Sequence, residues 1–269
     1  MYSGPSSARV PLLIFLAAAL LLIFGALHQT GAVPESVKTA WVTKFARQPS
    51  FLEIATKHGT DKVTDHQYQY MYEKHLSPIR NQKKLKMLEI GLGCNMNYGP
   101  GASYYTWLEY FPHVDLYYLE YDAACAQKWG AKTSGATIYT GDQADPDVLS
   151  EVISKSGGEF DIIVDDGGHT MKQQQTSLEH LWKAVKPGGI YFVEDLQTSF
   201  WTQYGGDPTG GKDPKIPTML KFIYEMIDDR MAPDGDKHLE LTADLRGVEC
   251  QREVCAFFKK GGEDEPGSV

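Results

Sequence analysis

The chain has 269 residues, of which 42% are hydrophobic and 23% are charged. This composition is that of an ordinary folded protein, and the length allows one substantial α/β domain with appendages. The net charge of −9 argues against a main role in binding a nucleic-acid backbone, because such proteins use a basic surface to release counterions from phosphates. We therefore predict no nucleic-acid partner.

An apolar segment lies near the start of the chain. Residues 10–27, VPLLIFLAAALLLIFGAL, carry no charge and follow Arg9. At about 1.5 Å per residue the segment nearly spans a bilayer core of about 30 Å. We predict that residues 1–32 form an uncleaved signal-anchor, with a cleaved signal peptide and a buried core helix as alternatives. The expected location is a single-pass anchor in a membrane of the secretory pathway, or secretion if the segment is removed.

Residues 33–80 have the pattern of helices interrupted at Gly59 and Pro78, and we predict a helical N-terminal extension there. From residue 86 onward, short apolar runs alternate with helical segments, as in β-α-β units around a parallel sheet. Because the runs are nearly all apolar, both faces of the sheet should be covered by helices. The predicted strands cover residues 86–91, 115–120, 137–141, 161–166 and 189–195, and the helices between them cover about 101–111, 122–131, 145–156 and 171–186.

The remainder of the chain is predicted to close the domain. Residues 197–214 are rich in glycine, proline and polar side chains and are long enough to form a lid. A helix over residues 217–231 should precede an antiparallel pair of strands at HLELTAD (238–244) and VCAFFKK (254–260). We predict that residues 261–269 form a disordered tail.

The four cysteines, Cys94, Cys125, Cys250 and Cys255, follow no metal-ligand spacing. Free thiols are the expected state. The alternative is a bond between Cys250 and Cys255 across a hairpin, which requires that the domain face an oxidising lumen.

The first predicted strand ends in LEIGLGC, which contains Glu89, Gly91 and Gly93. In sheets covered on both faces, ligands bind beyond the carboxyl ends of the strands. Glycines allow a ligand to approach the backbone closely, and an acid accepts hydrogen bonds from a ligand amine or hydroxyl. This pattern alone does not separate nicotinamide cofactors from S-adenosylmethionine (SAM).

The next two strands also end in polar side chains. Glu120 ends the second strand, where an acid can hold the two hydroxyls of a ribose, and Asp142 and Gln143 follow the third, where they can contact an adenine edge. Each of these residues alone is more often a helix cap or a solvated side chain. Three successive strand ends with suitable groups, in the order that a nucleoside needs, favour a cofactor site.

A set of carboxylates is predicted at the ends of the fourth and fifth strands. Asp166 ends FDIIVDD, whereas Glu194 and Asp195 end the fifth strand. If the two strands are neighbours, their ends lie about 5 Å apart. Carboxylates at such a short distance repel one another unless a cation compensates their negative charge. Oxygen ligands suit Mg²⁺ before Ca²⁺ or Mn²⁺. The sequence therefore predicts a divalent metal site, with helix capping as the alternative.

His169 follows one turn after Asp166. A lone histidine is more often structural or solvated. An imidazole titrates in the right range to take a proton from a hydroxyl, and a neighbouring metal would acidify that hydroxyl. We predict that His169 is a general base.

Several segments together resemble a known family. In chain order they are HGTDKVTDHQYQYMYEKHLSPIR, MLEIGLG, SYYTWLEYFP, GDQADPDVL, FDIIVDDGGH, LWKAVKPGGIYFVEDLQTSFW and YGG. Over roughly residues 50–260, the chain resembles the metal-dependent, SAM-using sugar O-methyltransferases of the mycinamicin VI 2''-O-methyltransferase and macrocin O-methyltransferase group.

The resemblance implies a class I methyltransferase domain at residues 81–260. Its fold is α/β, a Rossmann-like doubly wound sheet, mostly parallel with an antiparallel closing strand. The implied donor is SAM, and the implied acceptor is a sugar-like hydroxyl of a small molecule. The related enzymes form oligomers, so a homo-oligomer is also implied, for which residues 33–80 are available.

The resemblance also assigns roles to residues. It implies Mg²⁺ held by Asp166, Glu194 and Asp195, with His169 as the base. Glu89 and the Gly91 loop would face the methionine part of SAM, Glu120 its ribose and Asp142 its adenine. The predicted cofactor site is completed by Gly93, Ser103, Gln143 and Asp165.

Some features depart from the family pattern. Gly168 stands where the family usually has serine, Glu120 replaces the commoner aspartate, and the loop at residues 93–103 is longer than expected. The apolar N-terminal segment is foreign to the soluble antibiotic enzymes, so we expect a different acceptor.

Two other functions remain as alternatives. A nicotinamide-dependent oxidoreductase would share the first two strand ends but gives no reason for VDDGGH paired with VEDL. The second alternative is a membrane-tethered protein that keeps the fold but does not catalyse a reaction.

Overall fold

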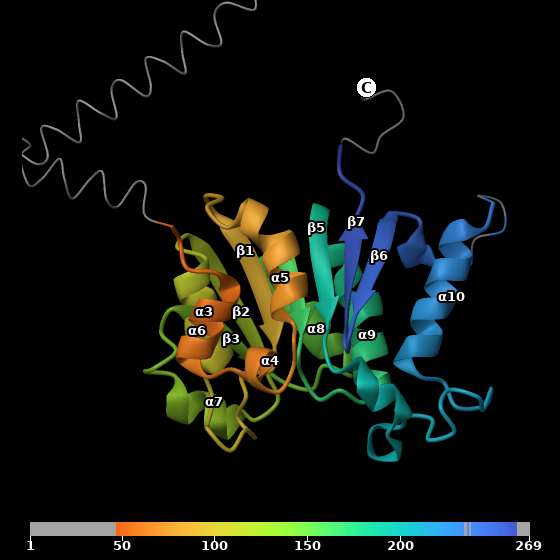
Figure 1. Ribbon diagram of the computed structural model, residues 1–269, viewed down its shortest axis with the longest axis horizontal. Helices are drawn as coiled ribbons and strands as arrows, with labels where there is room; N and C mark the ends of the chain where they lie inside the picture. Colours follow the sequence, from red (N-terminus) through yellow and green to blue (C-terminus); the bar gives the residue numbers. More distant parts are fainter. Residues whose placement is uncertain (1–46, 234–235, 237, 263–269) are drawn as a thin grey trace, which may run out of the picture. The chain divides into compact units, whose positions relative to one another are not determined.

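A seven-stranded sheet in the order β3-β2-β1-β4-β5-β7-β6 forms the centre of the protein, seen in a computed structural model that describes residues 47–233, 236 and 238–262 (Figure 1). Neighbouring strands from β3 to β5 run parallel, whereas β7 pairs antiparallel with both β5 and β6. The predicted α/β sheet with an antiparallel closing part is confirmed. The strands are β1 (Leu85–Ile90), β2 (Val114–Glu120), β3 (Ala136–Thr140), β4 (Phe160–Asp165), β5 (Val185–Val193), β6 (Leu245–Gln251) and β7 (Val254–Lys259).

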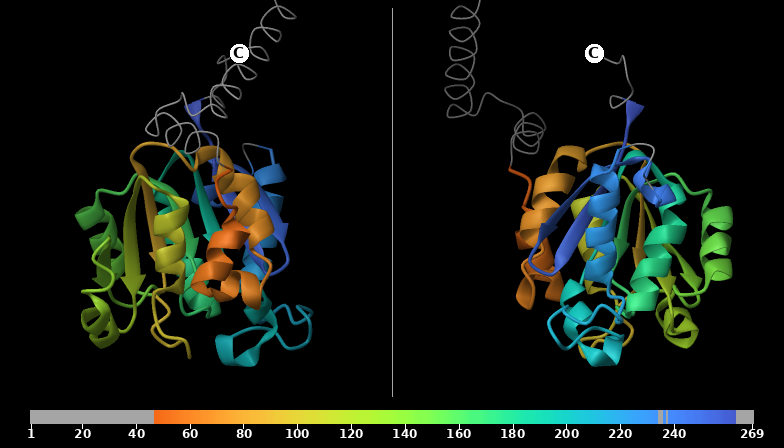
Figure 2. Two further views of the ribbon diagram at one scale, coloured as in Figure 1. Left: turned by 60° about the vertical axis from the view of Figure 1, so that its left-hand side comes forward. Right: turned by 90° about the vertical axis from the view of Figure 1, so that its right-hand side faces the viewer.

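Helices cover both faces of the sheet (Figure 2). One face packs against α8, α9 and α10, and the other packs against α3, α5 and α6. The helices are α3 (Phe51–His58), α4 (Asp61–Thr64), α5 (Gln69–Leu76), α6 (Ala102–Tyr110), α7 (Ala123–Trp129), α8 (Pro146–Ser156), α9 (Met171–Leu181) and α10 (Met219–Met231).

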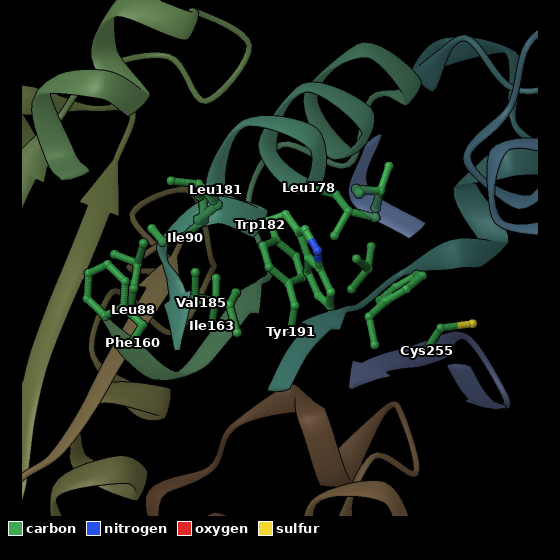
Figure 3. Close-up of a cluster of buried hydrophobic side chains, with 14 of the residues drawn as sticks. Leu88, Ile90, Phe160, Ile163, Leu178, Leu181, Trp182, Val185, Tyr191 and Cys255 are labelled. Atoms are coloured by element: carbon green, nitrogen blue, oxygen red, sulfur yellow. The ribbon is translucent and has the colours of Figure 1, made fainter. Parts of the chain in front are cut away.

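The apolar strand sequences divide between two cores because successive side chains point to opposite faces. In β4, Ile163 belongs to the core under α8 to α10, whereas Ile162 and Val164 belong to the core under α3 to α6. Figure 3 shows the first core, in which Trp182 and Tyr191 lie among aliphatic side chains. Burial on both faces explains why the strands read as continuous apolar runs.

Helices α3 and α5, within the predicted helical segment 33–80, pack on one face of the sheet. Phe51 of α3 contacts Tyr72 of α5 and Trp107 of α6, with ring centroids 5.0 and 5.3 Å apart. The described residues from Ser50 onward form one compact unit. Helices α4 and α5 thereby reach the carboxyl ends of the strands.

The predicted segment 1–32 and most of the predicted tail lie outside the described residues. In the part of the chain that is described, each helix is too short or too polar to cross a bilayer. The anchor therefore stays a prediction.

Two predicted elements near the end of the sheet were wrong. Residues 238–244 do not form a strand, because Asp229 at the end of α10 accepts hydrogen bonds from the backbone of His238 and from the hydroxyl of Thr242, and a 3₁₀ turn (Glu240–Thr242) forms. The closing partner of β7 is β6 instead. Residues 185–186, predicted as helix, already belong to β5, which begins at Val185 and accommodates its glycine pair by a register shift against β4.

Candidate active site

A cavity of about 500 Å³ opens at the carboxyl ends of β1 to β4. Its wall includes the glycine loop after β1, the ends of β2 and β3, and the turn after β4. Predicted site residues that line it are Gly91, Gly93, Ser103, Glu120, Asp142, Gln143, Asp166, His169 and Asp195. Glu89, Asp165 and Glu194 do not line it, and each of the three is buried.

Gly91 allows β1 and the turn after β4 to approach each other. Its φ is +96°, and a Cβ at this position would lie 2.2 Å from the carbonyl oxygen of Asp166. The Gly91 N–H donates to Leu119 O at 2.9 Å, and the Asp166 N–H donates to Ile90 O at 3.1 Å. A larger residue would have to displace the backbone that carries Asp166, so glycine is required at this crossing.

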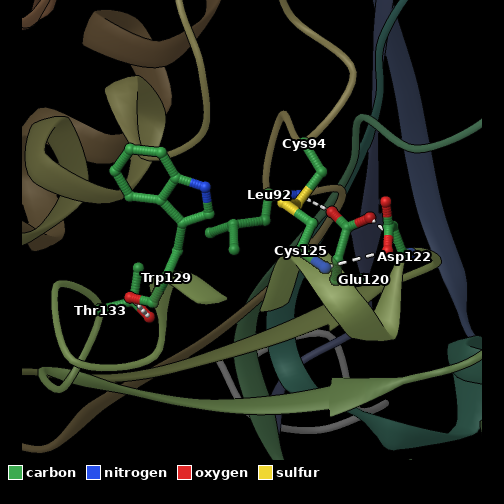
Figure 4. The surroundings of a disulfide bond; sticks show 7 residues. All are labelled: Leu92, Cys94, Glu120, Asp122, Cys125, Trp129 and Thr133. Atoms are coloured by element: carbon green, nitrogen blue, oxygen red, sulfur yellow. Dashed lines mark hydrogen bonds between the residues drawn. A yellow bond between two sulfur atoms is a disulfide. The ribbon is translucent and has the colours of Figure 1, made fainter. Parts of the chain in front are cut away.

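The carboxylate of Glu120 joins the loops that follow β1 and β2 (Figure 4). Its Oε2 accepts from Leu92 N and its Oε1 from Asp122 N, both at 2.8 Å. The carboxylate lies at the wall of the cavity with one lone pair on each oxygen already used. It retains the capacity to accept from ligand hydroxyls.

Gln143 and Asp165 hold the turn that carries Asp166 and His169. The Gln143 amide nitrogen donates to Asp165 Oδ1 and to Ser177 Oγ, both at 2.8 Å, and its oxygen accepts from Gly168 N at 2.8 Å. Burial raises the pKa of Asp165 to about 6, against the lowering effect of the Gln143 hydrogen bond. Both donors of the Gln143 amide and one lone pair of its oxygen are thus used by protein groups.

Asp166, His169 and Asp195 converge at one end of the cavity. Each offers a ligand atom, and these atoms lie within 4.8 Å of one another. His169 Nε2 lies 3.3 Å from Asp195 Oδ2, and its buried Nδ1 has no hydrogen-bond partner among the described residues. His169 and Asp195 both have left-handed backbone conformations, with φ of 58° and 55°. Such conformations are costly in non-glycine residues and cluster at functional sites.

Glu194 does not join this cluster, although it precedes Asp195. One of its oxygens accepts from Lys62 Nζ at 2.7 Å, and the other accepts from the Tyr72 hydroxyl. Burial, followed by the nearby Asp166 carboxylate, raises the pKa of Glu194 well above its usual value. The left-handed turn at Asp195 separates the two neighbouring acids into different surroundings.

Lys62 of α4 is a central residue that the sequence reasoning missed. Its side chain is 1% exposed, and Nζ lies 2.5 Å from Asp166 Oδ2, 2.7 Å from Glu194 Oε2 and 3.3 Å from Glu89 Oε1. Burial opposes the charge on Lys62, but these carboxylates raise its pKa well above the usual value. Lys62 therefore remains a cation and compensates the acids behind the cavity.

Asp195 is held from the same helical region. The Tyr68 hydroxyl donates to Asp195 Oδ1 at 3.0 Å, and His66 Nε2 lies 3.4 Å from the same oxygen. Burial acts to raise the pKa of Asp195, but His169, Gln197 and His66 lower it overall. Asp195 is therefore ionised at neutral pH and available to a cation.

All four cysteines are paired, so the expectation of free thiols was wrong. Cys94 bonds to Cys125, and Cys250 bonds to Cys255 across the hairpin of β6 and β7. The first pair forms because the loops after two adjacent parallel strands meet at the same edge of the sheet. The predicted topology already made these two strands neighbours, and this could have indicated the Cys94–Cys125 pair.

Comparison with known proteins identifies relatives. No protein-family model matches the chain. It is 29% identical over 242 residues to demethylmacrocin O-methyltransferase of Streptomyces fradiae, covering 88% of this chain and 59% of that protein. It is 30% identical over 230 residues to mycinamicin VI 2''-O-methyltransferase of Micromonospora griseorubida, covering 82% and 55%. The chain thus spans less than two thirds of the length of each.

A solved structure agrees with these similarities. The MycE methyltransferase from the mycinamycin biosynthetic pathway, in complex with Mg, S-adenosylhomocysteine (SAH) and mycinamycin VI, superposes with a TM-score of 0.69. The match has 28% sequence identity and covers 82% of this chain and 55% of that chain. Fold and sequence therefore agree with the resemblance predicted from the motifs: this chain is a relative of the sugar O-methyltransferases of the mycinamicin VI 2''-O-methyltransferase and macrocin O-methyltransferase group.

Proposed function

We propose that this protein is a SAM-dependent O-methyltransferase that uses Mg²⁺ to methylate a hydroxyl of a sugar or a glycosylated small molecule. The observation that carries the proposal is the single cavity that joins the glycine loop and Glu120 at one end to Asp166, His169 and Asp195 at the other. This arrangement suits a methyl donor and a hydroxyl acceptor side by side. The names of the relatives and the ligands of MycE support the same chemistry.

The donor set at the acid end of the cavity fits a divalent ion. Two carboxylates beside an imidazole offer mainly oxygen ligands, which suit Mg²⁺. Asp166 and Asp195 are the carboxylates that would hold the ion, whereas the sequence-predicted third ligand, Glu194, is bonded to Lys62 and Tyr72. When bound there, Mg²⁺ would supply positive charge that binds acceptor oxygens and lowers the pKa of the reacting hydroxyl.

His169 is positioned to take the proton. We assign the proton to Nε2, because Asp195 Oδ2 lies 3.3 Å away and would stabilise the imidazolium. The capping box between Thr170 and Gln173 begins α9 directly after His169 and fixes the position of the turn. The methyl group then moves from the sulfonium to the deprotonated oxygen, and correct alignment of donor and acceptor is the main task left to the protein.

The proposed cofactor contacts keep the predicted roles of Glu120, Asp142, the Gly91 loop and Ser103, and change those of Gln143, Asp165 and Glu89. We propose that Glu120 binds the ribose, that Asp142 contacts the adenine, and that the Gly91 loop and Ser103 face the methionine part. Gln143 and Asp165 would act indirectly, because their polar groups hold the turn at residues 166–169. Glu89 would act from behind the cavity through Ser103, whose hydroxyl donates to Glu89 Oε2 at 2.8 Å.

Replacing Asp166 by asparagine should lower the affinity for Mn²⁺ or Mg²⁺ by at least about tenfold, because one of two carboxylates facing the site loses its charge. Methyl transfer should fall in parallel and should respond to added metal. Titration calorimetry with Mn²⁺ and a methyl-transfer assay with and without chelator measure both effects.

The matched control is Asp147→Asn, which changes an exposed acid in the first turn of α8. It should leave Mn²⁺ affinity unchanged. Activity that is indifferent to chelator in the unmodified protein would rule out the metal part of the proposal.

A nicotinamide-dependent oxidoreductase is less well supported, since the relatives are named O-methyltransferases. Parallel titrations with SAH and NAD⁺ separate the two, because only the proposed enzyme should bind SAH.

Self-association stays a prediction. We further propose that the domain lies in the secretory pathway, anchored or targeted by residues 1–32. The two disulfides support an oxidising compartment, because thiols in the cytosol are kept reduced. Cells quenched in acid and treated with a thiol-alkylating reagent should yield protein with unlabelled cysteines. Full labelling would contradict this location.

A further inference from the structure

The Cys94–Cys125 disulfide joins two walls of the cavity (Figure 4). Cys94 belongs to the loop of residues 91–101 between β1 and α6, and Cys125 lies in the first turn of α7. Cys94 itself lines the cavity, as do Tyr121 and Asp122 just before α7. A covalent bond therefore sets the separation of two segments that the proposed cofactor would contact.

The loop has few other means of holding its shape. None of residues 93–100 is buried, and four glycines between residues 91 and 101 have positive φ, namely Gly91, Gly93, Gly99 and Gly101. Within residues 93–99, the backbone hydrogen bonds Met96 N to Gly93 O and Gly99 N to Met96 O connect the loop only to itself. Glycine-rich backbone without buried side chains has many accessible conformations.

The disulfide completes a ring of contacts around Glu120. Leu92 N and Asp122 N donate to the two oxygens of Glu120, and Cys125 N donates to Asp122 Oδ1 at 2.9 Å. The bond from Cys125 to Cys94 returns to the loop two residues beyond Leu92. Opening the disulfide would leave the exposed part of the loop held by the Gly101 N–H to Leu92 O bond at its end and by the hydrogen bond between Tyr98 and Asp61.

We propose that the Cys94–Cys125 disulfide is a positioning element that preforms the adenosyl-cofactor pocket. This inference rests on the proposed function, because it assigns the loop to the binding of SAM. If reduction lets the loop leave its binding conformation, the apparent dissociation constant rises in inverse proportion to the fraction that remains competent. A competent fraction of about one tenth would weaken binding about tenfold.

The second disulfide provides an internal control. Cys250 and Cys255 join the adjacent strands β6 and β7, and neither lines the cavity. A Cys250→Ser/Cys255→Ser variant therefore isolates the first disulfide while it keeps the cofactor loop intact. A Cys94→Ser/Cys125→Ser variant then gives the permanently open state.

The experiment is titration calorimetry with SAH on the Cys250→Ser/Cys255→Ser protein, before and after treatment with dithiothreitol. The dithiol supplies two electrons and two protons, so Cys94 and Cys125 become thiols and the reagent becomes a cyclic disulfide. We expect the SAH dissociation constant to rise at least about tenfold on reduction and to recover on reoxidation. Mn²⁺ affinity should change by less than about twofold, since Asp166 and Asp195 lie outside the loop.

The outcomes separate this inference from the function on which it rests. SAH binding that is equal in both redox states overturns the positioning role alone. Loss of SAH and Mn²⁺ binding together, or loss of the helical circular-dichroism signal, also overturns it, because the bond would then support the whole fold. If the oxidised protein binds no SAH, the proposed cofactor and this inference both fail.

Discussion

Replacing His169 by alanine is expected to lower the rate of methyl transfer by about 10²–10⁴-fold, the usual contribution of a positioned general base. The affinity for SAH should stay within about twofold, since the cofactor end of the cavity is formed by the loops after β1, β2 and β3. The physical reason is that no other uncommitted imidazole lies beside Asp166 and Asp195 among the described residues: His66 is already bonded to Glu253 at 2.9 Å.

The measurement is transfer of labelled methyl from SAM to an acceptor identified by screening crude metabolites with and without Mg²⁺. His180→Ala is the matched control, because His180 lies in α9, bonded to Ser150 and remote from the cavity wall. Mn²⁺ titration separates two roles for His169. A drop in Mn²⁺ affinity as large as the drop in rate would show that the imidazole holds the ion, and full activity would remove it as the base.

The meeting of acids from two strands was predictable because it follows from topology. A single crossover makes β4 and β5 neighbours, and Asp165 pairs with Val193 in the structure, so Asp166 and the Glu194-Asp195 pair lie at the same edge. What the sequence did not reveal is the direction of each side chain. A left-handed residue at Asp195 turns that carboxylate toward His169 and leaves Glu194 facing Lys62.

The part played by the helices before β1 was not predictable from local patterns. Lys62 reaches Asp166 across 104 residues of sequence and Glu194 across 132 residues. In a short polar helix a lysine ordinarily reads as a solvated side chain, and no periodicity marks it as buried. Only the packing of α3 and α5 on the sheet, through Phe51 and Tyr72, brings α4 over the strand ends.

The Cys94–Cys125 disulfide is the opposite case, because the predicted order of the strands contained enough information to predict it. Cys94 and Cys125 are separated by 31 residues without a recognised spacing, so sequence alone favoured free thiols. Each follows one of two strands that the β-α-β pattern already made neighbours. Topology therefore predicts this pair better than cysteine spacing does.

Replacing Lys62 by methionine is expected to destabilise the protein by about 3–5 kcal/mol at pH 7, because it leaves Glu194, Glu89 and Asp166 without their buried cation. Methionine keeps much of the length of the side chain, so the loss reports charge more than volume. Urea-induced unfolding of both proteins, followed by circular dichroism, measures the difference in the free energy of unfolding.

The stability of the Lys62→Met variant should also depend on pH in a definite direction. In the unmodified protein, burial raises the pKa of Glu194 and of Asp166, although Lys62 lowers both. Each acid therefore binds a proton more readily in the folded state than in the unfolded state. Without Lys62 this difference grows, and the stability of the variant should rise as the pH falls from 7 toward 5.

Lys57→Met is the matched control: Lys57 is 63% exposed and paired with Glu109 at the surface, so its loss should cost at most about 1 kcal/mol. A Lys62→Met protein as stable as this control, at both pH values, would mean that the acids behind the cavity are compensated by something other than Lys62.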